Sequence, residues 1–163
     1  MDINMKLRRY CPDDLNEISK LFYNTIHSIN NADYTPIQLD AWAPKAWDLA
    51  KFNEKLLRNY TVVVEFDKII IGFGSADNIG HFDLLYSHRD YQSRGVATLI
   101  CENIEHHIFS KNIETITTDS SITAKPFFRS RGYRLVAKQR IECRGQFFVN
   151  FKMKKVVTLY GNM

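Results

Sequence analysis

The sequence predicts an α/β (α+β) protein, a single domain over residues 1–155 with a mixed central sheet of about six to seven strands. First, the apolar and β-branched region 61–86 is divided by two short turns into three strand-length runs. Second, residues 96–110 carry an apolar row at four-residue steps, which indicates a helix between two strand-like runs. Third, apolar and polar residues alternate on both sides of Arg144-Gly145, a pattern typical of a hairpin.

The N-terminal part is expected to form one strand followed by helices. Met5–Tyr10 has the composition of a short strand, and Pro12 suits the first turn of a helix. Apolar residues then recur at three- and four-residue steps over residues 15–29, which indicates one buried helix face. A second helical stretch is expected near Thr35-Pro36, and residues 43–58 are mostly helical in pattern.

The remainder alternates between strands and helices. The expected elements are the strands Thr61–Phe66, Ile69–Ala76 and His81–Tyr86, the helix Val96–Ser110, the strand Ile113–Thr118, the helix Thr123–Arg131, and the strands Tyr133–Cys143 and Gln146–Met153. The order is therefore β-α-α-β-β-β-α-β-α-β-β. The helix over residues 96–110 should set the strand that follows it parallel to the strand before it, through a right-handed crossover. Residues 156–163 are expected to form a loose tail.

Composition limits the function classes. No stretch approaches the ~18 consecutive apolar residues of a membrane span. The N-terminus has no apolar signal segment and the three cysteines form no Cys-x-x-Cys pair, so we expect a cytoplasmic protein that binds no membrane. The net charge of +4 is uneven, because residues 78–163 hold 13 Lys/Arg and 7 Asp/Glu. This basic half suits an anionic ligand such as coenzyme A or nucleic acid, or is simply a solvated basic face. No Lys/Arg block exceeds two residues and no nucleic-acid-binding motif appears, which disfavours nucleic acid.

The segment from Gln92 to Ala97 is the most informative motif. It reads Gln-Ser-Arg-Gly-Val-Ala and lies between a strand-like run and a helix. A glycine at the start of a helix lets the backbone approach a bound group, and the first helical N–H groups point outward without intrahelical partners. Such a turn can bind a phosphate or pyrophosphate. The dinucleotide-binding and P-loop fingerprints are both absent from the sequence.

Two motifs and the element order together resemble the GNAT superfamily of N-acetyltransferases, over about residues 5–153. The glycine loop is similar to the family's acyl-CoA pyrophosphate loop, Gln/Arg-x-x-Gly-x-Gly/Ala. Residues 121–133 read Ser-Ile-Thr-Ala-Lys-Pro-Phe-Phe-Arg-Ser-Arg-Gly-Tyr, in register with the family's Asn-x-x-Ala-x-x-x-Tyr-x-x-x-Gly-Phe. The string over residues 34–44 looks like an uncharacterised bacterial branch. The resemblance implies a sheet splayed between its fourth and fifth strands, and transfer of an acetyl group from acetyl-CoA to a primary amine.

The resemblance also assigns the cofactor-binding residues. The pyrophosphate would bind the backbone of the glycine loop, and the pantetheine arm would bind along the end of the strand before it. The implied cofactor residues are Leu85, Tyr86, Ser87, Gln92, Ser93, Arg94, Gly95, Val96, Ala97, Thr98, Ser121, Ala124, Phe127 and Phe128. The backbone N–H of Tyr86 is the candidate oxyanion donor.

The strand before the glycine loop also carries the candidate catalytic residues. Asp83 is the leading candidate for the general base that takes the amine proton, with His81 as a weaker one. Strand alternation puts His81, Asp83 and Leu85 on one face. Phe128 stands where the family has the tyrosine that acts as general acid. Either Tyr86, Tyr91 or Tyr133 protonates the leaving sulfur instead, or the thiolate leaves without an acid. This departure keeps open a non-catalytic acetyl-CoA-binding module.

The acceptor is expected on the side built by the first two helices, where His27, Tyr34 and Trp42 are the candidate contacts. Trp42 and Tyr34 could hold a cationic amine through their rings, although Trp42 also suits the core. A small molecule or a peptide amine is the expected partner, and the resemblance allows a homodimer. No metal is expected, since His106 and His107 are adjacent on a helix and face different directions.

Overall fold

The computed structural model describes residues 4–157, which form one seven-stranded sheet in the order β1-β2-β3-β4-β5-β7-β6. The strands are β1 (Lys6–Arg9), β2 (Tyr60–Phe66), β3 (Ile69–Ala76), β4 (His81–Ser87), β5 (Thr115–Ser121), β6 (Arg134–Cys143) and β7 (Gln146–Val156). The α-helices are α1 (Leu15–Ser28), α2 (Pro36–Trp42), α3 (Leu49–Arg58), α4 (Val96–Ser110) and α5 (Lys125–Ser130), with short 3-10 turns η1 (Pro12–Asp14), η2 (Asn30–Ala32) and η3 (Arg89–Tyr91). The predicted fold class is confirmed, and the element order agrees except that three α-helices, not two, lie between β1 and β2.

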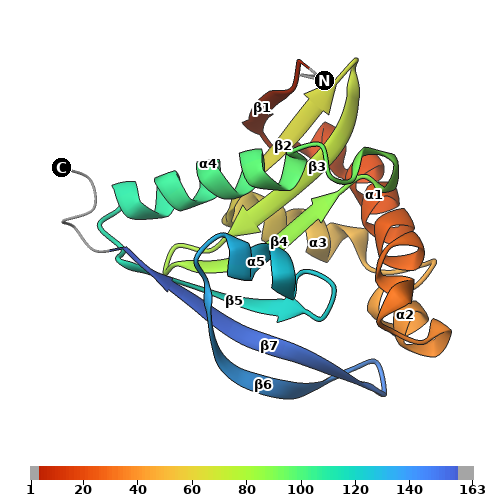
Figure 1. Cartoon of the computed structure of the whole chain (residues 1–163). Helices are drawn as coiled ribbons and strands as arrows, with labels where there is room; N and C mark the ends of the chain where they lie inside the picture. The colour runs from red at the N-terminus through yellow and green to blue at the C-terminus, as the bar shows by residue number, and fades with distance from the viewer. Residues whose placement is uncertain (1–3, 158–163) are drawn as a thin grey trace.

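Helices cover the two faces of the sheet separately. Figure 1 shows α4 and α5 in front of the sheet and α3 behind it. The core on the α4 side contains Ile100 and Ile104 from the apolar row of α4, packed on Phe82 and Ile116. The core on the other side contains apolar residues of α1, α2 and α3 packed on β2 and β3. Each face of the sheet is therefore buried by its own set of helices.

Two glycines let α4 approach the sheet closely. A Cβ atom on Gly72 would lie 2.4 Å from Val96 Cγ1, and one on Gly74 would lie 2.5 Å from Ile100 Cγ2. Both distances are shorter than any ordinary carbon contact. Because these two positions of β3 have no side chain, the first turns of α4 pack directly against the backbone of the strand.

The sheet splits between β4 and β5, as expected. These strands are parallel and pair only at His81–Thr117 and Phe82–Thr118. Beyond that point β4 continues beside β3, and β5 continues beside β7 as far as Ser121–Asn150. The two halves of the sheet therefore diverge in a V that opens toward the loop before α4.

Some element boundaries differ from the expected ones. The strand predicted at Ile113–Thr118 is β5, which begins at Thr115 and ends at Ser121, because its pairing with β7 persists to that residue. Strand β7 extends beyond Met153 to Val156, which pairs with Thr115, so Val156 belongs to the sheet and not to a tail. Residues 158–163 of the predicted tail lie outside the described residues.

The region 43–58 is only partly helical. Helix α3 begins after Asp48, whose carboxylate accepts a hydrogen bond from the Lys51 amide at 3.1 Å and caps the helix. Within residues 4–157, none of the helices has the length and apolar character needed to cross a bilayer.

Candidate active site

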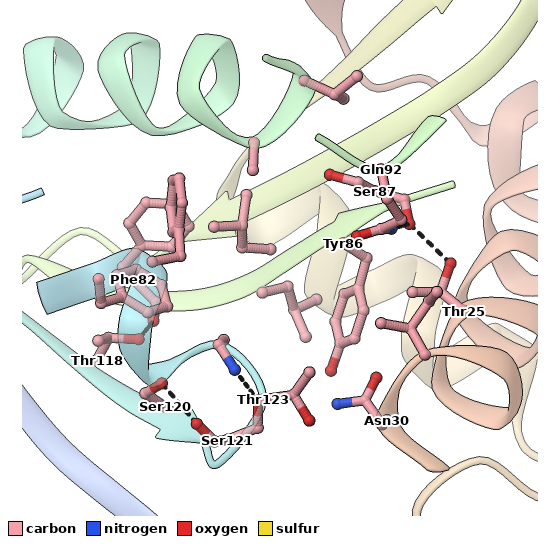
Figure 2. A pocket seen from close by; sticks show the side chains of 18 of the residues that line it. Thr25, Asn30, Phe82, Tyr86, Ser87, Gln92, Thr118, Ser120, Ser121 and Thr123 are labelled. Atoms are coloured by element: carbon pink, nitrogen blue, oxygen red, sulfur yellow. Dashed lines mark hydrogen bonds between the residues drawn. The ribbon is translucent and has the colours of Figure 1, made fainter. Parts of the chain in front are cut away.

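A cleft of about 360 Å³ occupies the V between β4 and β5. It is lined by the end of α1, the outer part of β4, the loop and first turn of α4, the end of β5, and α5. Figure 2 shows side chains from these elements pointing into it, with Tyr86 near its centre and Ser121 and Asn30 at opposite sides. The cleft therefore joins the α4 side of the sheet to the α1 side.

The glycine loop is shaped by its backbone. Ser93 and Gly95 have positive φ values of 60° and 83°, a left-handed backbone conformation that occurs in anion-binding turns. The first hydrogen bond within α4 runs from the Leu99 amide to the Gly95 carbonyl at 3.0 Å, which leaves the earlier amides of the helix for another acceptor. A Cβ atom on Gly95 would meet no atom within 4 Å. Glycine is thus required here for its φ value, and the space beside it is open.

The side chain of Gln92 fixes the start of this loop to the end of β4. Its side-chain amide donates to the carbonyl groups of Ser87 and His88, at 2.9 Å and 3.2 Å. Thr25 of α1 donates a further hydrogen bond to the Ser87 carbonyl at 2.8 Å. The end of β4 and the start of the loop are therefore tied to each other and to α1.

Nearly all the residues assigned to the cofactor line this one cleft. They are Leu85, Tyr86, Ser87, Gln92, Ser93, Gly95, Val96, Ala97, Thr98, Ser121, Ala124, Phe127 and Phe128. Arg94 is the exception, because its guanidinium lies over the Tyr91 ring, 5.5 Å from the ring centre, and its side chain does not line the cleft. Residues from three separate segments of the chain thus line one cleft.

A β-bulge changes the faces of β4. Ala76 pairs with Phe82, and the next residue back on β3, Ser75, pairs with Leu84, so Asp83 is the extra residue. Leu85 consequently packs on the α4 side with Phe82, whereas Leu84 and Tyr86 pack on the α1 side. The expectation that Leu85 shares a face with His81 and Asp83 was wrong, because simple alternation does not hold through a bulge.

The two candidate bases are both engaged by neighbouring side chains. Asp83 lines the cleft, and its Oδ2 lies 2.7 Å from Nζ of Lys55 on α3. His81 places Nδ1 2.8 Å from the Thr117 hydroxyl and Nε2 3.5 Å from Oδ2 of Asp119. The His81 side chain is thus directed toward β5.

Of the three candidate acceptor residues, only Trp42 lines the cleft. His27 points away from it, with Nε2 2.8 Å from the Ala43 carbonyl and its ring against Tyr23. Tyr34 is buried, and its hydroxyl accepts from the Ile122 amide and donates to the Val149 carbonyl, both at 2.9 Å. Both residues support the structure around the cleft without facing it.

Of the three tyrosines considered as general acids, two line the cleft and one does not. Tyr86 and Tyr91 line the cleft, and burial raises the pKa of Tyr86, so its hydroxyl keeps its proton. Tyr133 is buried on the α4 side, where its hydroxyl donates to Oε2 of Glu105 at 2.8 Å. Phe128, at the family's tyrosine position, packs edge-on against Phe82 and Tyr133.

Several cleft residues were not expected from the sequence. They are Thr25, Ile29 and Asn30 at the end of α1, Thr118, Asp119 and Ser120 on β5, and Thr123 before α5. The β5 residues could have been found, because the strand that follows a crossover helix lies beside the strand that precedes it. Nothing in the local pattern singles out Asn30, which reaches the cleft because α1 ends there.

Comparison with known proteins defines the class to which this fold and cleft belong. A family model described as an acetyltransferase (GNAT) domain matches residues 30–155, so the chain belongs to the GNAT family of acetyltransferases. The chain is 34% identical over 152 residues to the uncharacterized N-acetyltransferase YafP of Escherichia coli (strain K12), covering 93% of this chain and 95% of the relative. The predicted family and the enzyme class, an N-acetyltransferase, are confirmed.

Solved structures agree with this assignment. A GCN5-related N-acetyltransferase from Rhodopseudomonas palustris superposes with a TM-score of 0.92 at 30% identity, over 96% of this chain and 99% of that chain. The PaiA N-acetyltransferase of Thermoplasma acidophilum, solved in complex with coenzyme A, superposes with a TM-score of 0.79 over 95% of this chain and 100% of that chain. At 14% identity the second likeness shows the fold alone.

Proposed function

We propose that this protein transfers the acetyl group of acetyl-CoA to a primary amine that attacks the thioester directly, through a tetrahedral intermediate. Family membership provides the reaction class, acetyl transfer. The observation that carries the proposal is the cleft in the V of the sheet, which has the open amides of the α4 turn at one side and Trp42 and Asn30 at the other. A donor and an acceptor can thus meet from opposite faces of the sheet.

The pyrophosphate of the donor binds at the first turn of α4. The backbone supplies the contacts, because the loop has the left-handed conformation that occurs in anion-binding turns and the dipole of α4 favours an anion there. Arg94 lies outside the cleft beside Tyr91. We therefore assign it at most a contact with the outer part of the coenzyme.

The pantetheine arm lies in the V, along the edge of β4 that loses its β5 partner after Phe82. Leu85, Tyr86 and Ser87 form this unpaired edge within the cleft. A backbone N–H here, that of Tyr86 in our proposal, stabilises the negative charge on the oxygen of the tetrahedral intermediate. The amine proton passes to a carboxylate at the base of the V, where Asp83 is the base predicted from the sequence.

The leaving group needs no protein acid in this scheme. An ordinary thiol has a pKa of about 8.5, so thiolate is a tolerable leaving group near neutral pH. Tyr86 is the tyrosine that reaches the cleft from β4, and its raised pKa makes it a hydrogen-bond donor and a weak acid. Phe128 favours a second candidate function, a module that binds acetyl-CoA without turnover, because phenylalanine cannot protonate the leaving sulfur.

Calorimetry with coenzyme A, followed by an assay of its release from acetyl-CoA with a panel of primary amines, tests the proposal. Binding without release on any amine would favour the binding module, and absence of binding would refute both candidates.

The loop assignment is tested by Gly95→Glu with Gly95→Gln as its matched control. Both variants carry the same strain at φ 83° and nearly the same bulk, so they differ in charge alone. We expect Gly95→Glu to lose coenzyme A binding by at least tenfold more than Gly95→Gln. Equal affinities would contradict a phosphate at this turn.

A further inference from the structure

Two carboxylates lie side by side in sequence register at the base of the V. The last pair between β4 and β5 is Phe82–Thr118, so the next residues, Asp83 and Asp119, are the first on each diverging strand. Both line the cleft.

The two carboxylates differ in the protein groups that contact them. Asp83 is the bulge residue of β4, and Lys55 approaches its Oδ2 to 2.7 Å, while the Asp83 side chain is only 25% exposed. A cation in direct contact with a carboxylate competes with an incoming ammonium group for the same oxygen. Asp83 is therefore paired with a lysine of the protein, although its buried Oδ2 makes no hydrogen bond within residues 4–157.

Asp119 is held in place but remains available. Its Oδ1 accepts a hydrogen bond from the Gln139 side chain at 2.9 Å, and its Oδ2 lies 3.5 Å from Nε2 of His81. His81 is fixed in turn by the Thr117 hydroxyl at 2.8 Å from Nδ1. The Asp119 side chain is 47% exposed, and within residues 4–157 no lysine or arginine forms an ion pair with it, including its cross-strand neighbour Lys152 on β7.

A buried amide marks the acceptor side of the same cleft. Asn30 is 6% exposed, lines the cleft, and its side chain has no hydrogen-bond partner among the residues that the structure describes. Figure 2 shows its amide directed into the cleft toward the side where the Tyr86 hydroxyl and Thr123 lie. This amide is therefore available to hydrogen-bond an incoming polar ligand.

We infer that Asp119, oriented by His81 and Gln139, is the carboxylate that takes the proton from the attacking amine, and that Asp83 with Lys55 supports the bulge. The inference rests on the proposed acetyl transfer and deepens it. The amine nitrogen forms a bond to the acetyl carbon and gives one proton to Asp119. The carbon–sulfur bond then breaks, and its electron pair leaves on sulfur as the thiolate of coenzyme A. Asn30 binds a polar group elsewhere on the acceptor.

The test compares Asp119→Asn with Asp83→Asn, two isosteric changes on neighbouring strands. Coenzyme A release is measured with a panel of primary amines, and binding of propylammonium to the protein loaded with coenzyme A is followed by NMR. We expect Asp119→Asn to lower kcat/KM about 100-fold and to weaken propylammonium binding, with coenzyme A affinity unchanged. Asp83→Asn should have a smaller effect on both, and Asp119→Glu should recover part of the rate. Glu114→Gln is the control, because Glu114 is exposed, lies just before β5 and does not line the cleft.

The outcomes separate this inference from the proposed function. A larger loss in Asp83→Asn than in Asp119→Asn overturns the assignment of the base, while acetyl transfer stands. A wild-type protein that binds coenzyme A but shows neither turnover nor saturable propylammonium binding overturns the acceptor site. Failure to bind coenzyme A at all counts against the proposed function itself.

Discussion

The hydroxyl of Tyr34 joins three segments that are distant in sequence. It accepts from the Ile122 amide and donates to the Val149 carbonyl, which lie 88 and 115 positions along the chain. Burial raises the pKa of Tyr34, so the phenol stays neutral and can make both bonds. A single side chain thus fixes the β5–α5 loop, which carries the Ser121 side of the cleft, against η2.

We expect Tyr34→Phe to lower the free energy of unfolding by about 1–3 kcal/mol, because it leaves a buried amide and a carbonyl without a partner. Urea denaturation measures the change. Tyr60→Phe is the control, since it removes one hydrogen bond to the Asn103 side chain. A loss in Tyr34→Phe no larger than in the control would contradict the bridging role.

Asp14 should carry part of the stability toward acid. Hydrogen bonds from Arg8 at 2.8 Å to each oxygen hold the pKa of this carboxyl below its usual value. A lowered folded-state pKa means that the stabilisation is present above the unfolded pKa of about 3.9 and is lost as pH falls through the folded pKa. The urea midpoint should therefore fall less between pH 6 and pH 3 in Asp14→Asn than in the wild type. Equal falls would show that other groups control acid unfolding.

At the scale of elements, periodicity predicted most of what the structure contains. The spans Ile69–Ala76 and Val96–Ser110 agree with β3 and α4, because turn residues bound the apolar run of β3 and the apolar face of α4 repeats near four residues. The bulge at Asp83 was not predictable, since it arises from pairing with β3 and leaves no mark in the local pattern. Asp83 and Tyr34 contact Lys55 and Val149, which are distant in sequence. The sequence around each residue therefore could not show whether its side chain is held by the protein or is free to contact a ligand.

The close approach of α4 to β3 gives an element-scale prediction. Gly74→Ala should cost about 1–3 kcal/mol, because the new methyl would press on Ile100. In the double variant Gly74→Ala with Ile100→Ala, the total loss should be smaller than the sum of the two single losses, since removal of the isoleucine creates the missing space. Strict additivity in thermal unfolding would contradict this packing.

At the scale of the molecule, the sheet consists of two halves joined by only two paired positions. A donor bound in the cleft would contact β4 and the α4 turn in one half and β5 and α5 in the other. Such a ligand would add contacts between the two halves at a junction where few backbone hydrogen bonds join them.

Coenzyme A at about 100 times its dissociation constant should raise the free energy of unfolding by about 2.7 kcal/mol, by mass action alone. Hydrogen exchange should slow on both sides of the V, at the end of β4 and at the end of β5. Protection confined to the α4 turn would mean that the ligand does not span the two halves.

The glycine at position 72 of β3 has a consequence for ligand affinity. A side chain there would collide with Val96, the residue that begins α4, and would push the whole opening of the helix outward. If the donor binds at this turn as we propose, we expect substitutions of Gly72 to weaken donor affinity from a position in the core. Substitutions at this depth offer a route to graded weakening of coenzyme binding with every ligand contact left chemically intact.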